Sequence, residues 1–229
     1  MDVDGCPLPE DRRYATADDV WYREENDGAS ATVGLTSLLA SFAGRFHAVT
    51  FRPVEGLIDA GRSVATVESV RFTGAVRLPV RGRIVGRNRA ISDRPKLLND
   101  DPYGAGWVVR IEPEDPADAR RTLPTAAAAR EAFAARRAEL GVRCRPAVPD
   151  EELIEVGAEC AAILVRLGEA IDRRAPGEVV LLVTDDPTSP IEMVRWSDRT
   201  GHAVVHQARN QDLFEFLVRR EADPHPRRR

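Results

Sequence analysis

The sequence contains almost no lysine. Of its 33 basic residues only Lys96 is a lysine, and all the others are arginines. This scarcity excludes any mechanism that needs two lysines. Any lysine-based chemistry in the chain must therefore use Lys96.

Cysteine, long apolar runs and excess positive charge are scarce as well. Three cysteines do not make a disulfide framework, so we expect a cytoplasmic, reducing compartment. No apolar run approaches the roughly 20 residues that span a bilayer. The acidic, proline-rich start does not resemble a secretory signal. A net charge of −4 gives no sign of a phosphate-binding surface, so neither a membrane nor a nucleic acid is an expected partner.

The first half of the chain is rich in short β-like runs. A chain of 229 residues with 43% hydrophobic and 31% charged residues is typical of one large globular domain or two small ones. Glycine and proline separate runs of branched residues, a pattern that indicates a small β-sandwich or barrel. The predicted strands are ATVGLT (31–36), FHAVTF (46–51), SVATVESV (63–70), GAVRLPV (74–80) and GWVVRIEP (106–113).

The middle of the chain changes character. The alanine-rich segment 124–140 consists of good helix formers, begins near a proline and is followed by Gly141, so it predicts a helix. The segment RCRPAVPD (143–150) is typical of a linker. We therefore expect a first domain over 14–116 and a helical linker over 117–149.

The last third alternates between strand and helix patterns. Strands are predicted at EELIEV (151–156), 178–186, 202–209 and 211–220, and helices at 160–175 and 189–201. Ser189, Pro190 and Glu192 predict a capping box for the second helix. The order β-α-β-α-β-β predicts an α+β two-layer sandwich over 150–220, with both helices on one face of a four-stranded sheet. The tail 221–229 is predicted to be disordered.

The first half resembles the glycine cleavage system H-protein over roughly residues 14–115. The resemblance rests on ATVGLT, AGRFHAVTF, AGRSVATVESV, LPVRGRIVGRN and, most specifically, NDDPYGAGW (99–107). It implies an all-β barrel-sandwich hybrid of the lipoyl-domain kind. The family carries a lipoyl arm on the lysine of an E-S-V-K hairpin.

Arg71 occupies the position of that lysine, because the E-S-V-K pattern reads Glu68-Ser69-Val70-Arg71 in this sequence. Lipoylation forms an amide on a deprotonated amine, whereas a guanidinium stays charged. Lys96 is 25 residues farther along the chain and does not replace it. Asp19 also stands where the family usually has a histidine. We therefore expect no lipoate cofactor.

The last third resembles the TusA/SirA-like sulfur carriers. The resemblance rests on ELIEVGAEC (152–160), RAPGE (174–178), VTDDP (183–187) and LFEFLVRR (213–220). It implies that Cys160 carries sulfur as a persulfide at the start of a helix, where the helix dipole stabilises a thiolate. The family motif Cys-Pro-x-Pro reads Cys160-Ala161-Ala162-Ile163 here, so both prolines are missing.

An alternative remains open for Cys160. Apolar residues at 153, 156, 160, 164, 167 and 171 follow helical spacing, so one long helix after Pro149 with Cys160 as an inert core residue also fits. Cys6-Pro7-Leu8-Pro9 spells the carrier motif, but no strand precedes it, and it is better interpreted as the entry to the first domain. Cys144 is predicted to be a linker cysteine. The scattered histidines predict no metal site.

The two resemblances together predict a protein that relays sulfur, either as a carrier or as a sulfurtransferase-like protein. The sequence leaves open whether it acts as a catalytic enzyme. Cys160 would accept persulfide sulfur from a desulfurase or rhodanese-like donor and pass it to an acceptor, while the first domain docks a partner. Two alternatives remain. One is an adaptor or regulatory protein with both carrier sites inactive, and the other is an H-protein homologue in glycine cleavage.

Overall fold

The computed structural model describes residues 1–224 and divides the chain into two units, Met1–Arg145 and the part that begins at Pro146. Each unit has its own buried cores. The predicted two-domain organisation, sheet-rich and then α+β, is confirmed. Of the predicted disordered tail 221–229, residues 225–229 lie outside the described part.

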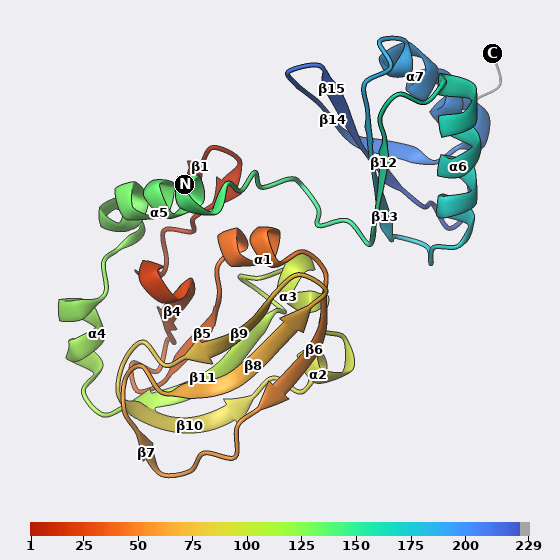
Figure 1. The fold of residues 1–229 in the computed structure, drawn as a ribbon. Coiled ribbons are helices and arrows are strands. Elements are labelled where there is room, and N and C mark those ends of the chain that lie inside the picture. Colours follow the sequence, from red (N-terminus) through yellow and green to blue (C-terminus); the bar gives the residue numbers. More distant parts are fainter. Residues whose placement is uncertain (225–229) are drawn as a thin grey trace. The chain divides into compact units, whose positions relative to one another are not determined.

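Unit 1 contains two large sheets and a two-stranded hairpin at its N-terminus (Figure 1). The first has six strands in the order β3-β4-β5-β11-β10-β7, and the second has three in the order β6-β8-β9. Within residues 1–145 the sheets stay open, so they form no closed barrel. The six-stranded sheet comprises β3 (Arg13–Ala15), β4 (Val20–Glu24), β5 (Ala31–Leu35), β7 (Leu57–Ile58), β10 (Gly82–Arg87) and β11 (Trp107–Pro113). The three-stranded sheet comprises β6 (Phe46–Phe51), β8 (Ser63–Ser69) and β9 (Thr73–Arg77).

The main core of unit 1 forms between these sheets. Side chains from both sheets meet in it, as Val76 of β9 and Val109 of β11 do, and both are fully buried. Four short helices contribute buried residues to this core. They are α1 (Ser37–Ala43), α2 (Ala90–Asp93), α3 (Leu97–Asp100) and α4 (Pro116–Thr122). A 3₁₀ helix, η1 (Thr16–Asp18), lies between β3 and β4 and buries no side chain.

A second core lies beneath α5 (Ala126–Leu140), inside the segment that we expected to be a linker. Thr125 caps this helix by accepting a hydrogen bond from the backbone of Ala128, and Gly141 ends it in the left-handed region. Phe133 and two alanines of α5 pack against Trp21 and the N-terminal hairpin. The hairpin consists of β1 (Asp2–Val3) and β2 (Cys6–Pro7).

The expectation of unpaired cysteines in unit 1 is wrong. Cys6 and Cys144 form a disulfide with their Cα atoms 5.0 Å apart. The sequence could not indicate this pairing because 138 residues separate the two cysteines. The bond joins the N-terminal hairpin to the segment that follows α5.

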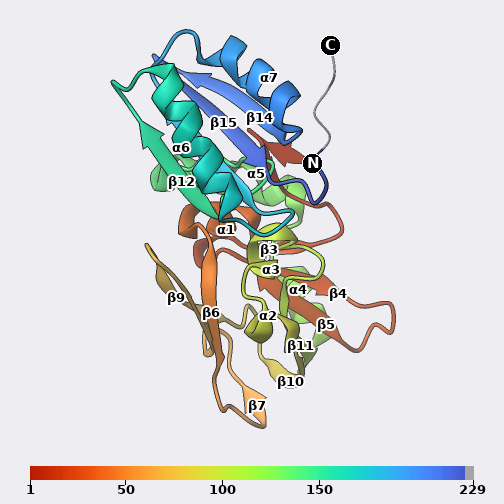
Figure 2. The same cartoon turned by 90° about the vertical axis from the view of Figure 1, so that its right-hand side faces the viewer.

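Unit 2 has the predicted β-α-β-α-β-β order. Its sheet order is β12-β13-β15-β14, in which β12 and β13 are parallel and the other pairs are antiparallel. Both helices pack on one face of this sheet, around Val180 and Leu182 (Figure 2). The elements are β12 (Glu151–Glu155), α6 (Cys160–Asp172), β13 (Val179–Thr184), α7 (Ser189–Thr200), β14 (Ala203–Asn210) and β15 (Leu213–Arg219).

Two local expectations in unit 2 are wrong. The single long helix after Pro149 does not form, because Glu151–Glu155 pair with β13 as a strand and α6 begins only at Cys160. The capping box is also absent. Ser189 is the first residue of α7 rather than its cap, and its hydroxyl is buried without a partner.

The helices of residues 1–224 are too short or too polar to cross a membrane.

Candidate functional site

Cys160 opens α6 just beyond the end of β12, and its free thiol is half-buried. Because β12 and β13 are parallel neighbours, the loops that follow them meet at the same edge of the sheet. The loop after β13 brings Asp185, Asp186 and Thr188 to Cys160. The starts of α6 and α7 therefore converge on this thiol.

Carboxylates hold the two loops together. Asp185 Oδ1 accepts a hydrogen bond from the Gly157 backbone N–H at 2.8 Å. Asp186 Oδ1 accepts from the backbone N–H and the hydroxyl of Thr188, each at 2.7 Å, and Asp186 also accepts from the Cys160 N–H. The N-terminus of α6 thus already faces a negative charge within its own unit.

The pKa of the Cys160 thiol is raised above its ordinary value. Burial is the main cause, a hydrogen bond with Thr188 opposes it, and the charges of Asp186 and Glu192 add to the rise. The pKa of Asp186 is lowered, first by the hydrogen bond from the Thr188 hydroxyl, so this carboxylate is ionised at neutral pH. The expected stabilisation of the thiolate by the helix dipole is therefore offset, and Cys160 is mainly a thiol at neutral pH.

A groove of about 780 Å³ runs between α6 and α7 from Cys160. Small residues such as Ala161 and Gly168 leave room along α6. The charged lining residues are Glu169, Asp172, Glu192 and Arg199, three carboxylates against one guanidinium. The groove is therefore acidic, which disfavours anionic reagents and suits a positively charged partner.

The hairpin between β8 and β9 places Arg71 at the tip where the resemblance expects a lysine. The neighbouring Val70 is 97% exposed, and the Ser69 hydroxyl donates to the Ala43 carbonyl at 2.7 Å, which fixes the hairpin on α1. Lys96 lies elsewhere and forms an ion pair with Asp100 at 3.4 Å. A lipoyl amide needs an amine, so the residues present at the tip do not fit this group.

Asp19, the other departure from the H-protein pattern, has a structural partner. Its side chain is buried and forms an ion pair with Arg136 of α5 at 3.1 Å. Burial raises the pKa of Asp19, while the hydrogen bond with Arg136 lowers it. The position that the family usually gives to a histidine thus anchors α5 in this chain.

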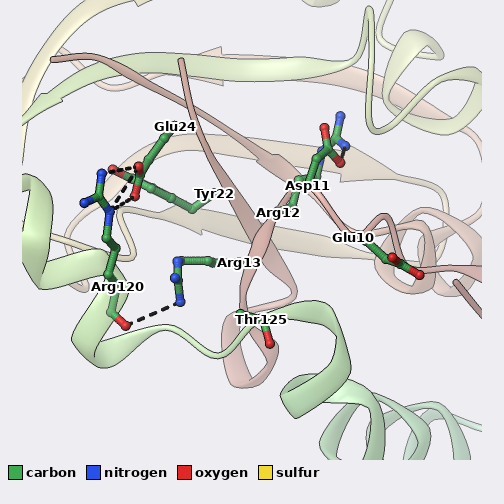
Figure 3. A pocket seen from close by; sticks show the side chains of 8 residues that line it. All are labelled: Glu10, Asp11, Arg12, Arg13, Tyr22, Glu24, Arg120 and Thr125. Atoms are coloured by element: carbon green, nitrogen blue, oxygen red, sulfur yellow. Dashed lines mark hydrogen bonds and ion pairs between the residues drawn. The ribbon is translucent and has the colours of Figure 1, made fainter. Parts of the chain in front are cut away.

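A separate cavity of about 270 Å³ lies in unit 1 (Figure 3). Arg120 forms a two-pronged ion pair with Glu24, at 2.7 Å in its shorter contact, and Arg13 donates to the carbonyl oxygens of Arg120 and Leu123. Burial is the main reason that the pKa of Tyr22 rises to about 12. The guanidinium groups of Arg13 and Arg120 are thus already engaged within the protein.

The sequence analysis named Cys160 as a candidate but did not reveal the contacts around it. Thr188 and Glu192 lie in a different loop and helix from Cys160, so no local motif reveals their effect on the thiol. In the part of the chain that the structure describes, no three His, Cys, Asp or Glu side chains form a metal-binding group.

Each of the two units matches a known protein family. The model of the glycine cleavage H-protein family matches residues 12–135, more than half of the chain, and that of sulfurtransferase TusA matches residues 155–220. Glycine cleavage system H protein 5 of Aquifex aeolicus is 42% identical over 147 residues, which cover 62% of this chain and 98% of the relative. H protein 2 of the same organism is 35% identical, covering 48% and 67%.

Among solved structures, a glycine cleavage system H protein from Mycobacterium marinum is 32% identical over 47% of this chain and 87% of its own, with a TM-score of 0.43. The family matches and the Aquifex relatives carry the assignment. The chain belongs to the glycine cleavage H-protein family and contains a TusA sulfurtransferase domain that follows its H-protein domain in the sequence.

Proposed function

We propose that the protein is a sulfur carrier in which Cys160 holds a persulfide. The observation that carries this proposal is a free, half-buried thiol at the first residue of α6, beside the groove between α6 and α7. The TusA match over residues 155–220 supports the assignment. A carrier needs a thiol that a partner can reach and a space in which the partner can dock, and unit 2 supplies both.

The chemistry is a transfer of one sulfur atom. The Cys160 thiolate attacks the outer sulfur of a donor persulfide R–S–SH, which yields Cys160–S–SH and releases RS⁻. Because burial, and to a lesser extent the charges of Asp186 and Glu192, raise the pKa of Cys160, loading requires help in removing the proton. A donor with a basic surface would provide that help by offsetting the two carboxylates. A cysteine desulfurase or a rhodanese-like protein with such a surface is the proposed donor.

The H-protein domain would then dock a protein partner without lipoate, since Arg71 offers no amine for attachment. The sulfur acceptor would be the protein recruited by this domain. We place this relay in the cytoplasm, where thiols are kept reduced.

Incubation of the full chain with a cysteine desulfurase and cysteine tests the proposal. Intact mass should rise by one sulfur atom, and peptide mapping should locate the gain on Cys160. The variant Cys160→Ser, which keeps Cys6 and Cys144, should lose the gain at that peptide. If Cys160 gains no sulfur from this donor or from a rhodanese, the adaptor alternative, with both carrier sites inactive, replaces the proposal.

A further inference from the structure

The disulfide of unit 1 brings together two distant segments of the chain. Cys6 belongs to the N-terminal hairpin, and Cys144 follows α5, 138 residues later. Salt links hold the same segments together, since Arg137 of α5 pairs with Asp4 of the hairpin at 2.6 Å. The hairpin and the segment around Cys144 are therefore linked by an ion pair as well as by the disulfide.

The two cysteines differ in their exposure. Cys6 is fully buried in the second core, packed with residues such as Leu8 and Phe133. Cys144 is half-buried, and its sulfur lies 3.9 Å from the Ser37 carbonyl oxygen. A reagent from solution therefore meets Cys144 first, while Cys6 can react only with a group already held on Cys144.

Cys144 lies beside a structured turn at the end of α5. Arg143 and Arg145 flank it in the sequence, and Arg137 donates a hydrogen bond to the carbonyl of the nearby Val142 at 3.2 Å. The thiolate is the nucleophilic form of cysteine, and it must be reached by the reagent it attacks. In the reduced protein the more exposed Cys144 is thus the attacking cysteine, and the buried Cys6 lies in place to resolve its products.

The geometry points to a second sulfur site in this protein: a dithiol, Cys144 and Cys6, that reduces persulfides to hydrogen sulfide. The Cys144 thiolate attacks the outer sulfur of a persulfide R–S–SH, which forms Cys144–S–SH and releases RS⁻. The Cys6 thiol then attacks Cys144 Sγ, the disulfide forms, and HS⁻ leaves and takes up the Cys6 proton. In sum, the dithiol and R–S–SH give the disulfide, RSH and H₂S, so the dithiol supplies the two electrons.

Tight packing around the pair favours a persulfide over a larger disulfide as substrate. A Cβ atom added to Gly5 would lie 3.2 Å from the Cys144 carbonyl oxygen, so the hairpin and the segment after α5 are in close contact. The intermediate adds only one sulfur atom and a hydrogen beside this contact, and the leaving group HS⁻ is the smallest that thiol exchange produces. The reaction does not involve Cys160 and is independent of the proposed carrier function.

The test uses the full chain with Cys160→Ser, so Cys160 cannot take part in the reaction. The result therefore does not depend on whether the proposed carrier function is correct. The protein is reduced with dithiothreitol, freed of reductant and mixed with glutathione persulfide without oxygen. We expect one sulfide released for each Cys6–Cys144 disulfide formed, with sulfide measured by bimane labelling and the disulfide by peptide mass spectrometry. Adding Cys6→Ser should stop sulfide release and leave one extra sulfur atom on the Cys144 peptide.

The background is set by the chain with all three cysteines replaced by serine. Sulfide release from the dithiol protein at the rate of this triple variant would overturn the proposal. A second measurement needs no change at Cys6 or Cys144: in the reduced protein, iodoacetamide should modify Cys144 before Cys6. Modification of Cys6 first, or of both at equal rates, would equally contradict the assigned roles.

Discussion

Two carboxylates act on the Cys160 thiol from outside its own helix. Asp186 accepts the Cys160 N–H and thereby occupies the positive end of α6, and Glu192 reaches the site from α7. Both charges disfavour the thiolate. The reactivity of the thiol therefore depends on the charges that surround it as well as on its own helix.

Removing the charge of Glu192 should activate the thiol. In Glu192→Gln the pKa of Cys160 falls, so its alkylation by iodoacetamide at pH 7 should be about 2- to 5-fold faster, with the rise in rate shifted to lower pH. Labelling at the Cys160 peptide across pH 6 to 10 measures this. Glu169 lines the same groove, but its carboxylate is not among the charges that act on the thiol, so the variant Glu169→Gln serves as the control. An unchanged or slower rate in Glu192→Gln would contradict the electrostatic account.

His202 makes unit 2 sensitive to acid. It is buried against Trp196, and its Nδ1 accepts a hydrogen bond from the Glu221 N–H at 3.2 Å. Burial is the main reason that its pKa lies below its ordinary value. Below an unfolded pKa of about 6.5 the unfolded chain binds a proton that the folded chain does not, so stability falls as pH drops.

We expect the urea concentration at the unfolding midpoint of unit 2 to decrease as the pH is lowered from 7.5 to 5.5. We expect His202→Gln to reduce that dependence on pH. His206→Gln, which removes a half-buried histidine of β14, is the matched control and should retain the full dependence. If His202→Gln were as sensitive to acid as the unchanged protein, another group would be responsible.

A single substitution should restore the capacity for lipoylation. Arg71 lies at an exposed hairpin tip beside Val70, so Arg71→Lys would present an amine there. We expect a lipoate ligase to add one lipoyl group to Arg71→Lys and none to the unchanged chain, as measured by intact mass. Lys96 is the internal control because it is present in both proteins. Lipoylation of the unchanged chain would contradict the expectation that it carries no lipoate.

The sequence could place Arg71 and Cys160 but not their surroundings. Each sits in a local pattern, a hairpin and a strand-helix junction, which short stretches of sequence encode. The residues that contact Cys160 come from the loop after the neighbouring parallel strand. Cys6 and Cys144 are brought together only by the tertiary fold. Contacts of this kind depend on packing between segments far apart in the chain, which periodicity does not report.

At the scale of elements, α5 seals the second core of unit 1. It contributes Phe133, Ala126 and Ala129 to the core, and its Arg136 pairs with the buried Asp19. The sequence predicted the helix from its alanine content but assigned it to a linker, since that composition shows little apolar face. Likewise α1 (Ser37–Ala43) was not predicted, because its apolar residues directly follow a strand of similar composition.

Truncating the aromatic side chain of α5 should be costly. Phe133 is 1% exposed, so Phe133→Ala removes buried contacts and leaves a cavity, at a cost of about 3 to 5 kcal/mol in the free energy of unfolding. Denaturant melts of unit 1 measure the loss. Glu131→Ala, at an exposed position of the same helix, should change stability by less than about 0.5 kcal/mol. A loss of similar size in both variants would show that helix propensity, and not core packing, governs the result.

At the scale of the whole molecule, redox conditions should act on one unit and not on the other. The Cys6–Cys144 bond lies entirely within unit 1, while the buried clusters of unit 2 contain no disulfide. Closing so long a loop restricts the unfolded chain, so breaking the bond should cost unit 1 about 2 to 5 kcal/mol. Unit 2 has its own sheet and core and should unfold independently of that change.

Urea unfolding with and without dithiothreitol, followed by hydrogen exchange of peptides from each unit, tests this independence. Reduction should shift the unfolding transition of unit 1 to a lower urea concentration and leave the transition of unit 2 unchanged. The transition of unit 2 can be recognised by its sensitivity to acid, which we attribute to His202. Cys6→Ser should reproduce the shift without reductant, and Cys160→Ser should produce none. If reduction moved both transitions together, the two units would form one cooperative folding unit, and the redox state of the H-protein domain would then be coupled directly to the stability of the carrier domain.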